Sequence, residues 1–433
     1  MNPEAIAAKA PVRAQARFET VCVVGLGYIG LPTATAFALS RRQVIGVDIN
    51  RNAVDTINRG GVHIVEPSLD VAVRTAVGGG YLRATTVPEP ADAFLIAVPT
   101  PFGEGHKPDL RHVEAAARAI APVLKRGDLV VLESTSPVGS TERLSRWLAE
   151  ERGDLRFPHQ AGEAPDVNIA YCPERVLPGH VMRELFENDR IIGGLTPACS
   201  ERACELYGIF VKGDCIVSNA RVAEMCKLTE NAFRDVNIAF ANELSMICET
   251  LQIDVWELIA LANRHPRVNI LQPGPGVGGH CIAVDPWFIV DGAPEQARLI
   301  RTAREVNDSK PGWVLERIEE AVQQAERDGR RREQLTIAVF GLSFKPDIDD
   351  LRESPALHIA CELAARHPGP MLAVEPHISN LPGQLDRAEV SLVDPATALD
   401  RADIAVLLVD HRAFAEQAPP ARLKIVDTRG LWT

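Results

Sequence analysis

The sequence contains no long apolar run, and this sets the first limit on what the protein can be. No stretch approaches the roughly 18 consecutive apolar residues that a membrane-spanning helix requires. The first 17 residues also lack the uninterrupted hydrophobic segment of a secretion signal. We therefore expect a cytoplasmic protein without a membrane partner, in which residues 1–17 form a loose N-terminal extension.

Basic residues are fewer than acidic ones, and the cysteines do not follow the spacing of a disulfide or metal motif. Lys and Arg number 46 against 58 Asp and Glu, a net charge of −12. This balance disfavours a nucleic acid as the main partner but allows a local basic pocket for a small anion. The nine cysteines are an odd number, without CxxC pairs or nearby histidine clusters, so neither a disulfide framework nor a metal site is indicated.

Short apolar runs, by contrast, are abundant and follow the pattern of an α/β fold. The 433 residues are 46% hydrophobic, enough for two or three domains. The runs TVCVVGLG, QVIGVDI, AFLIAVPT, LVVLEST and VNIAYCP are typical of buried strands, and amphipathic segments lie between them. After a charged break at residues 330–333, the strand pattern returns in LTIAVFGLSF, MLAVEP, DIAVLLVD and LKIVDT. The alternation predicts two Rossmann-like parallel-sheet domains joined by a long central helix.

A glycine-rich turn follows the first predicted strand. Gly25-Leu-Gly27-Tyr-Ile-Gly30 opens a helix, and Asp48 ends the next strand. Glycines in this context allow a tight turn and a close approach of the backbone to a pyrophosphate, which N–H groups of the helix N-terminus can bind. Asp48 can accept from ribose hydroxyls and would repel a 2′-phosphate, which favours NAD over NADP, although the nearby Arg51 weakens that preference.

The segment from Ala220 to about Gln252 has the spacing of one long helix. Its apolar residues recur every three or four positions in a single stripe. The stripe consists of Val222, Cys226, Thr229, Phe233, Val236, Phe240, Leu244, Ile247 and Leu251. Lys227 and Asn231 fall together on the opposite face, one turn apart. That face is either solvated, or it lines a cleft while the stripe packs in a core or against a second subunit.

Two further segments contain residues with possible chemistry. GPGVGGHCIAVDP, residues 274–286, places Cys281 in a glycine-rich loop. The turn FGLSFKP, after the first strand of the second α/β domain, lacks the GxGxxG pattern, so it holds a different nucleotide or none. Lys345 and Arg352 beside it can bind phosphates as cations, although each is also typical of an ordinary surface charge.

These segments together resemble the UDP-glucose/GDP-mannose dehydrogenase family. The matching strings follow one another along nearly the whole chain: GLGYIGLP, EST at 133–135, CPER at 172–175, Lys227 with Asn231, GVGGHC with Asp285, FGLSFKP and DLRESP. Longer strings such as RDVNIAFANEL and LANRHPRVNILQPGPGVGGHCIAVDPWFIV are similar to members that oxidise UDP-linked acetamido sugars. Such members supply bacterial surface polysaccharides such as enterobacterial common antigen.

The resemblance implies a four-electron oxidation. Members of the family convert the C6 alcohol of a nucleotide sugar to a carboxylate with two NAD⁺ in one site. Cys281 would attack the C6 aldehyde as a thiolate, and the resulting thiohemiacetal would be oxidised to a thioester that water cleaves. Lys227 would stabilise oxyanions at C6, and Asn231 would orient the C6 oxygen.

Three more catalytic residues are implied by the same resemblance. Asp285 would act on Lys227 or on a water in proton transfer. Glu174 would direct or activate the water that hydrolyses the thioester, and Thr135 would hold a water beside these groups.

Plainer interpretations of these loop residues stay open. Asp285, which precedes Pro286, is also typical of a residue that caps a turn. Glu174 is also placed to form an ion pair with Arg175. His280 is expected to be an ordinary loop histidine, because adjacent side chains in an extended segment diverge.

The binding residues are implied by the resemblance as well. The cofactor-binding residues are Gly25, Gly27, Tyr28, Ile29, Gly30, Asp48, Arg51, Pro99, Thr100 and Thr135. The substrate-binding residues are Glu174, Arg175, Val176, Lys227, Asn231, His265, Arg267, Gly278, Lys345 and Arg352. Arg267 matches a position that reaches the neighbouring subunit's sugar site in relatives, which implies a homodimer with a shared active site. Lys345 and Arg352 match positions near the UDP end of the substrate.

The expected domain order follows from these assignments. A NAD-binding Rossmann domain occupies residues 18–205, a central helical domain for dimerisation and catalysis residues 206–329, and a UDP-sugar-binding Rossmann-like domain residues 330–433. One departure concerns Pro178, where relatives that oxidise glucose often have a second acid. The departure fits a pocket altered for an acetamido sugar.

Three alternative functions remain at this point. The first is the same chemistry on UDP-N-acetylglucosamine, which differs only in configuration at C2 and which no residue excludes. The second is an ordinary two-electron NAD dehydrogenase, in which Cys281→Ser would barely affect turnover. The third is a catalytically silent nucleotide-sugar-binding protein, which the joint presence of Cys281, Lys227, Asn231 and Asp285 disfavours.

Overall fold

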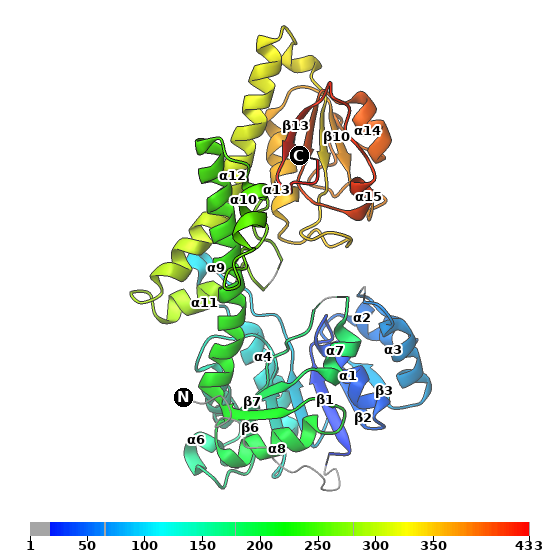
Figure 1. Cartoon of the computed structure of the whole chain (residues 1–433). Helices are drawn as coiled ribbons and strands as arrows, with labels where there is room; N and C mark the ends of the chain where they lie inside the picture. The colour runs from blue at the N-terminus through cyan, green and yellow to red at the C-terminus, as the bar shows by residue number, and fades with distance from the viewer. Residues whose placement is uncertain (1–17, 65, 178, 280, 433) are drawn as a thin grey trace. The chain divides into compact units, whose positions relative to one another are not determined.

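The chain folds into two compact units, which divide between Glu230 and Asn231. The computed structural model (Figure 1) describes residues 18–64, 66–177, 179–279 and 281–432. The expected extension at residues 1–17, the departure at Pro178 and the loop histidine His280 lie outside the described residues.

The first unit is built on an eight-stranded sheet of order β3-β2-β1-β4-β5-β6-β7-β8 (Figure 1). Its strands are β1 (Thr20–Val24), β2 (Gln43–Val47), β3 (Leu82–Thr85), β4 (Ala93–Ile96), β5 (Leu129–Leu132), β6 (Asn168–Tyr171), β7 (Arg190–Gly194) and β8 (Cys215–Asn219). Its helices before α9 (Ala220–Leu251) are α1 (Gly30–Leu39), α2 (Arg51–Asn58), α3 (Leu69–Gly78), α4 (Arg111–Ile120), α5 (Ser140–Glu151), α6 (Pro158–Ala161), α7 (Val181–Glu187) and α8 (Pro197–Tyr207). The predicted parallel sheet is confirmed, with one antiparallel pairing between β6 and β7 that the sequence did not reveal.

The strands of this sheet are buried because helices cover both faces. Val21 and Val23 of β1 pack into one core with α1, α3 and α8. Cys22 and Val24 pack into a second core with α4 and α5. A strand covered on both faces needs apolar residues at every position, which explains why TVCVVGLG shows no polar alternation.

The second unit contains a five-stranded parallel sheet of order β11-β10-β9-β12-β13. Its strands are β9 (Ile337–Phe340), β10 (Met371–Val374), β11 (Val390–Leu392), β12 (Ile404–Leu407) and β13 (Lys424–Asp427). Its helices after α9 are α10 (Val255–Ala262), α11 (Asp285–Gly292), α12 (Arg298–Arg327), α13 (Pro355–Arg366), α14 (Pro395–Arg401) and α15 (Arg412–Ala415). Helices α12 and α13 cover one face and α14 and α15 the other, so the predicted second α/β domain is confirmed.

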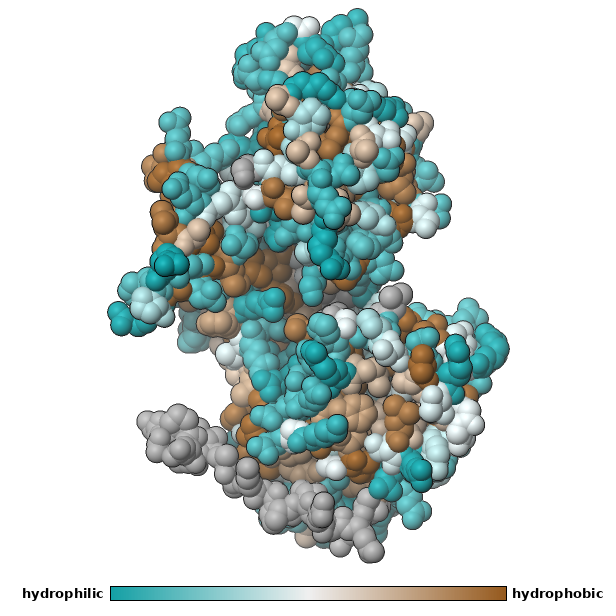
Figure 2. Space-filling model, turned by 45° about the vertical axis from the view of Figure 1, so that its right-hand side comes forward, coloured by the Kyte–Doolittle hydropathy of each residue, from teal (hydrophilic) through white to brown (hydrophobic). Residues whose placement is uncertain are grey.

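Helix α9 (Ala220–Leu251) confirms the predicted long helix but turns its apolar stripe outward. Phe233, Phe240 and Leu251 are 70%, 53% and 61% exposed. The other face is buried and partly polar, since Asp235 accepts from the guanidinium of Arg304 in α12 at 2.6 Å. The interpretation of that face as solvated is therefore wrong. Hydrophobic areas, drawn in brown, lie among the hydrophilic surface (Figure 2).

No helix within the described ranges has both the length and the apolar character needed to cross a membrane.

Candidate active site

The glycine turn after β1 is shaped for a nucleotide. Gly25 has φ +92°, and a Cβ there would lie 2.5 Å from the carbonyl oxygen of Ala97. A Cβ on Gly30 would lie 1.8 Å from the carbonyl oxygen of Gly25. Packing therefore explains these two glycines. Gly27 differs, because beyond its own atoms and those of its two chain neighbours no described atom lies within 4 Å of its Cβ position. This open space fits the close approach of a pyrophosphate.

Asp48 lies beside this turn and is partly buried. Its Oδ2 accepts from the N–H of Leu26 at 2.9 Å, and its Oδ1 accepts from the N–H of Asn50 at 2.8 Å. A carboxylate oxygen has two lone pairs, so each retains capacity for a ribose hydroxyl. Arg51 begins α2 and is exposed. The residues present thus fit NAD, with the glycine turn for the pyrophosphate and Asp48 for the ribose.

A hydrogen bond connects the loop after β4 with the loop after β5. Thr100 donates its hydroxyl to the carbonyl oxygen of Thr135 at 2.5 Å. Pro99 precedes it as an exposed residue, and Tyr28 is also exposed. These predicted cofactor residues all follow the carboxyl ends of strands in the first sheet, the edge at which α/β folds bind ligands.

The loop after β6 contains Glu174, which is almost completely buried. Its Oε2 lies 2.7 Å from Nη1 of Arg190, and its Oε1 accepts from the N–H of Arg175 at 2.6 Å. The interpretation of Glu174 as an ion-pair partner of the Arg175 side chain is wrong, because that guanidinium pairs with Glu230 of α9 at 2.8 Å. Val176 follows and packs on the core of the first unit.

Glu133, at the end of β5, is a buried acid that the sequence interpretation passed over. It is 2% exposed, and it accepts the hydroxyl of Tyr207 at 2.6 Å. Burial raises the pKa of its carboxyl from 4.5 to about 7 despite that hydrogen bond. Its place directly after the apolar run LVVL was the available signal, since an acid that ends a buried strand is seldom an ordinary surface charge.

In the second unit, Cys281 begins the turn that leads into α11. The side chain is exposed, and its carbonyl oxygen accepts from the N–H of Val284 at 3.1 Å and of Asp285 at 2.8 Å. Asp285 is 3% exposed and starts α11, where the helix dipole stabilises a carboxylate. Its Oδ2 accepts from the Nδ2 of Asn231 at 2.5 Å. The structure therefore brings Asn231, Asp285 and the cysteine turn together.

The glycines before Cys281 serve packing within the chain. A Cβ on Gly278 would lie 2.5 Å from the carbonyl oxygen of Glu353 and 2.9 Å from Cβ of Phe344. The cysteine loop therefore packs against the segment that contains the predicted phosphate ligands. Lys345 of that segment is exposed, and Arg352 pairs with Asp350. Gly278 and Gly279 therefore have a packing role through their tight contact with Phe344.

The remaining predicted residues lie on the surface or in the other unit. His265 and Arg267 are exposed in the loop after α10, where the N–H of Arg267 lies 3.4 Å from Nδ1 of His265. Lys227 is partly buried on α9, in the first unit with Glu174 and Thr135. The predicted catalytic residues are therefore divided between the two units.

A group that could bind a metal ion lies at the carboxyl edge of the second sheet. Possible ligand atoms of Asp347, His377 and His411 lie within 4.8 Å of one another. However, Nδ1 of His411 accepts from the N–H of Asp347 at 2.9 Å, and its Nε2 lies 3.0 Å from Oε2 of Glu375. With one ring nitrogen accepting and the other donating, His411 has no lone pair for a metal ion in this arrangement.

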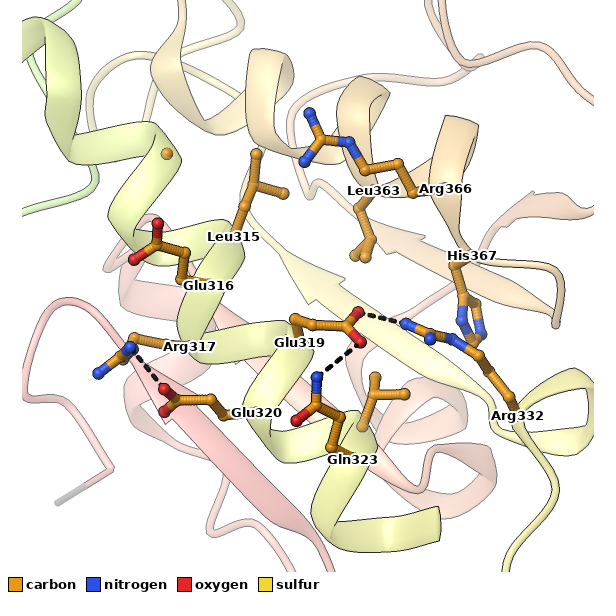
Figure 3. A pocket seen from close by; sticks show the side chains of 12 residues that line it. Leu315, Glu316, Arg317, Glu319, Glu320, Gln323, Arg332, Leu363, Arg366 and His367 are labelled. Carbon is orange, nitrogen blue, oxygen red and sulfur yellow. Dashed lines mark hydrogen bonds and ion pairs between the residues drawn. The ribbon is translucent and has the colours of Figure 1, made fainter.

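A pocket of about 680 Å³ lies between α12 and α13 (Figure 3). Its charged side chains compensate one another, since Glu319 contacts Arg332 and Gln323, and Arg317 pairs with Glu320 at 2.6 Å. None of the predicted site residues lines it. We therefore assign this pocket no part in the predicted chemistry.

Comparison with known proteins gives matches over nearly the whole chain. The UDP-glucose/GDP-mannose dehydrogenase family matches with its NAD binding domain at residues 19–211, its central domain at 221–309 and its UDP binding domain at 338–433. An NDP-N-acetyl-D-galactosaminuronic acid dehydrogenase of Ralstonia nicotianae is 67% identical, over 96% of this chain and 97% of the relative. A UDP-N-acetyl-D-mannosamine dehydrogenase of Yersinia pestis is 64% identical, over 96% of this chain and 99% of the relative. The structure of a UDP-D-ManNAc dehydrogenase from Pyrococcus horikoshii is similar with a TM-score of 0.85 at 37% identity, over 96% of each chain.

Proposed function

Because the chain belongs to the UDP-glucose/GDP-mannose dehydrogenase family, we propose that it oxidises the C6 alcohol of UDP-N-acetyl-D-mannosamine to UDP-N-acetyl-D-mannosaminuronate. It is an NAD-dependent oxidoreductase of UDP-sugars. Beyond this activity we propose the identity of the sugar, the use of two NAD⁺ per turnover and a thioester intermediate. The product would supply a bacterial surface polysaccharide such as enterobacterial common antigen. We place the enzyme in the cytoplasm.

In this proposal the work is divided along the chain. Residues 18–205 bind NAD, residues 206–329 provide the cysteine loop and the dimer contact, and residues 330–433 bind the UDP group. The strings that resemble the family support this division, together with the matched NAD binding, central and UDP binding domains.

One observation carries the proposal: the turn of Cys281 is hydrogen-bonded to Asp285, and the carboxylate of Asp285 accepts from the amide of Asn231. Asp285 donates its N–H to the carbonyl oxygen of Cys281, and its side chain accepts from Asn231. The thiol is therefore fixed beside a carboxylate that can move a proton and an amide that can orient an oxygen. A merely structural cysteine needs neither, and it is usually buried, whereas Cys281 is exposed.

The steps at C6 follow from these groups. NAD⁺ when bound accepts a hydride from carbon in each of the two oxidations. The C6 alcohol passes its hydroxyl proton to a water beside Asp285, and Lys227 stabilises the negative charge that develops on the oxygen. The Cys281 thiolate then forms a C–S bond to the aldehyde carbon, which gives a thiohemiacetal. Its oxidation gives a thioester, and one water cleaves the C–S bond to release the carboxylate and return the thiol.

Hydrolysis of the thioester is assigned to the loop after β6. Glu174 is held by Arg190 and by the N–H of Arg175, so its carboxylate is fixed in direction. We propose that it orients the water, with Thr135 holding a water on the neighbouring loop.

The test is the number of NADH formed per sugar consumed. We expect two NADH per UDP-N-acetylmannosamine for the unmodified enzyme. Cys281→Ser should form less than one hundredth of the acid, whereas Cys361→Ser, a change at a half-buried thiol of α13, should leave turnover within twofold. One NADH per sugar, or full turnover of Cys281→Ser, would contradict the thioester route.

A second sugar is favoured by one specific comparison. The relative at 67% identity is named for an N-acetyl-D-galactosaminuronic acid, whereas the relative at 64% is named for UDP-N-acetyl-D-mannosamine. UDP-N-acetylgalactosamine and UDP-N-acetylglucosamine therefore belong in the same assay. Turnover of the galacto sugar alone would replace the proposed substrate and leave the chemistry at Cys281 unchanged.

We also propose a homodimer formed through α9. The stripe that contains Phe233, Phe240 and Leu251 is apolar and exposed along the helix, and such a continuous apolar face on a soluble protein marks a protein contact. A second copy of this chain fits because the stripe can pair with itself about a twofold axis. Sedimentation should give twice the monomer mass of 47.1 kDa, and a monomer at micromolar concentration would contradict the dimer.

A further inference from the structure

We infer that Glu224 is a positioning residue for the proposed reaction, because it ties the loop of Thr135 to the helical turn of Lys227. The inference rests on the proposed function, in which Thr135 and Lys227 both act at C6. It concerns residues of the first unit alone.

Glu224 is a buried carboxylate with three donors from a distant segment. It is 0% exposed. Its Oε2 accepts from the N–H of Gly139 at 2.6 Å, and its Oε1 accepts from both the N–H and the hydroxyl of Thr141, at 2.8 and 2.6 Å. Burial of a carboxylate is costly unless donors surround it. This arrangement therefore fixes Glu224 and the three donors in one geometry.

The donors belong to the end of the loop that contains Thr135. Gly139 and Thr141 flank the first residue of α5, where N–H groups lack partners within the helix. The beginning of the same loop is fixed to β4, since the N–H of Glu133 donates to the carbonyl oxygen of Ile96 at 2.9 Å. Thr135 thus lies between two anchors, and only the second of them reaches α9.

The same carboxylate belongs to the part of α9 that contains Lys227. Lys227 follows Glu224 by three residues, which is less than one turn and about 4.5 Å along the axis. On the next turn Glu230 pairs with Arg175 of the loop after β6, at 2.8 Å. Lys227 therefore lies between two acids, and each acid connects α9 to a loop of the candidate site.

A second ion pair between α5 and α9 provides a matched control. Glu142 of α5 accepts from Arg221 of α9 at 2.6 Å, but the two side chains are 30% and 61% exposed. Exposed pairs contribute little to stability or geometry. If any link between the two helices were sufficient, loss of this pair would have the same effect as loss of the Glu224 contacts.

The first experiment separates kcat from KM in the full-length enzyme. Glu224→Gln replaces one acceptor oxygen with an amide that faces the donors, and we expect kcat for UDP-N-acetylmannosamine to fall at least tenfold while KM for NAD stays within twofold. Thr141→Val removes one donor and keeps the shape, so we expect a fall of about threefold. Glu142→Gln should stay within twofold.

Equal effects of Glu224→Gln and Glu142→Gln would overturn the inference, as would unchanged kcat in Glu224→Gln. If Glu224→Gln does not fold, Thr141→Val decides, and unchanged kcat in that variant overturns the inference.

The second experiment is independent of the substrate. Amide hydrogen exchange of Gly139 and Thr141 should be at least tenfold faster in Glu224→Gln than in the unmodified protein, and unchanged in Glu142→Gln. Unchanged exchange in Glu224→Gln would overturn the inference even if the sugar is right. If the unmodified enzyme forms no NADH from the sugar, the proposed function fails, and the exchange rates still decide whether Glu224 holds the loop.

Discussion

The two α/β sheets begin with turns of the same geometry that have different consequences. In the first, Gly25 donates its N–H to the carbonyl oxygen of Val47, and Leu26 donates to Asp48. In the second, Gly341 with φ +89° donates to the carbonyl oxygen of Val374 at 2.8 Å. The next residue of that turn donates to an acid at the end of the second strand, as in the first domain.

The acids differ in what surrounds them. Asp48 is partly exposed and can accept from a ribose. The corresponding Glu375 is 4% exposed, because His411 lies against it at 3.0 Å and the N–H groups of Leu342 and Ser343 donate to it. The second turn also has Ser343 where the first has the open Gly27. The same backbone turn thus leaves room for a dinucleotide in the first domain, whereas in the second domain the corresponding acid, Glu375, is enclosed.

The largest expected effect concerns the enclosed acid. Glu375→Gln should lower the free energy of unfolding by about 3 kcal/mol, because the buried carboxylate accepts from His411 and from the N–H groups of Leu342 and Ser343, and an amide cannot accept from all of these donors. Affinity for NADH should not change. Glu389→Gln, at an exposed position before β11, should have an effect within about 0.5 kcal/mol. Denaturant unfolding and NADH titration would measure both, and equal stabilities would remove the distinction between the two turns.

The next effect concerns the open glycine. Gly27→Ala should reduce NADH affinity by about 30-fold, or about 2 kcal/mol, because the added methyl group occupies the space of the pyrophosphate. The fold should tolerate it, since beyond the chain neighbours of Gly27 no described atom lies within 4 Å of the Cβ position. Gly153→Ala, also at an open position, serves as the control. Unchanged affinity in Gly27→Ala would mean that the dinucleotide does not approach this turn.

The features that the sequence predicted are those set by local pattern. Strands buried on both faces produce continuous apolar runs, and the glycine turn has a fixed order of residues, so both could be read directly. The periodicity of α9 identified its apolar stripe and its opposite face. It could not say which face the chain itself covers, because that depends on α12, whose Arg304 meets Asp235 from 69 residues away.

The residues that the sequence did not reveal are buried acids with distant partners. Glu224 meets Gly139 across 85 positions, and Glu133 meets Tyr207 across 74. In the sequence Glu224 looks like an ordinary polar position of a helix, and Glu133 shows only that an acid ends an apolar run. Only the folded structure shows that their hydrogen-bond donors come from other elements. For this reason the motifs alone could not predict these contacts of the candidate site.

The smallest expected effect is a difference in how two buried glutamates, one in each domain, make the stability of the fold depend on pH. Burial raises the pKa of Glu133 to about 7, so its stabilising contribution is present below about 4.5 and is lost as pH rises through 7. For Glu375 burial alone would raise the pKa, but His411 and the backbone donors outweigh it and lower the pKa, so its contribution is lost as pH falls. Between pH 6 and pH 8 the unmodified protein should lose about 1.3 kcal/mol that Glu133→Gln retains. Unfolding followed at both pH values checks this, and an identical pH slope in Glu133→Gln would show that Glu133 is ionised throughout and that the two acids do not differ.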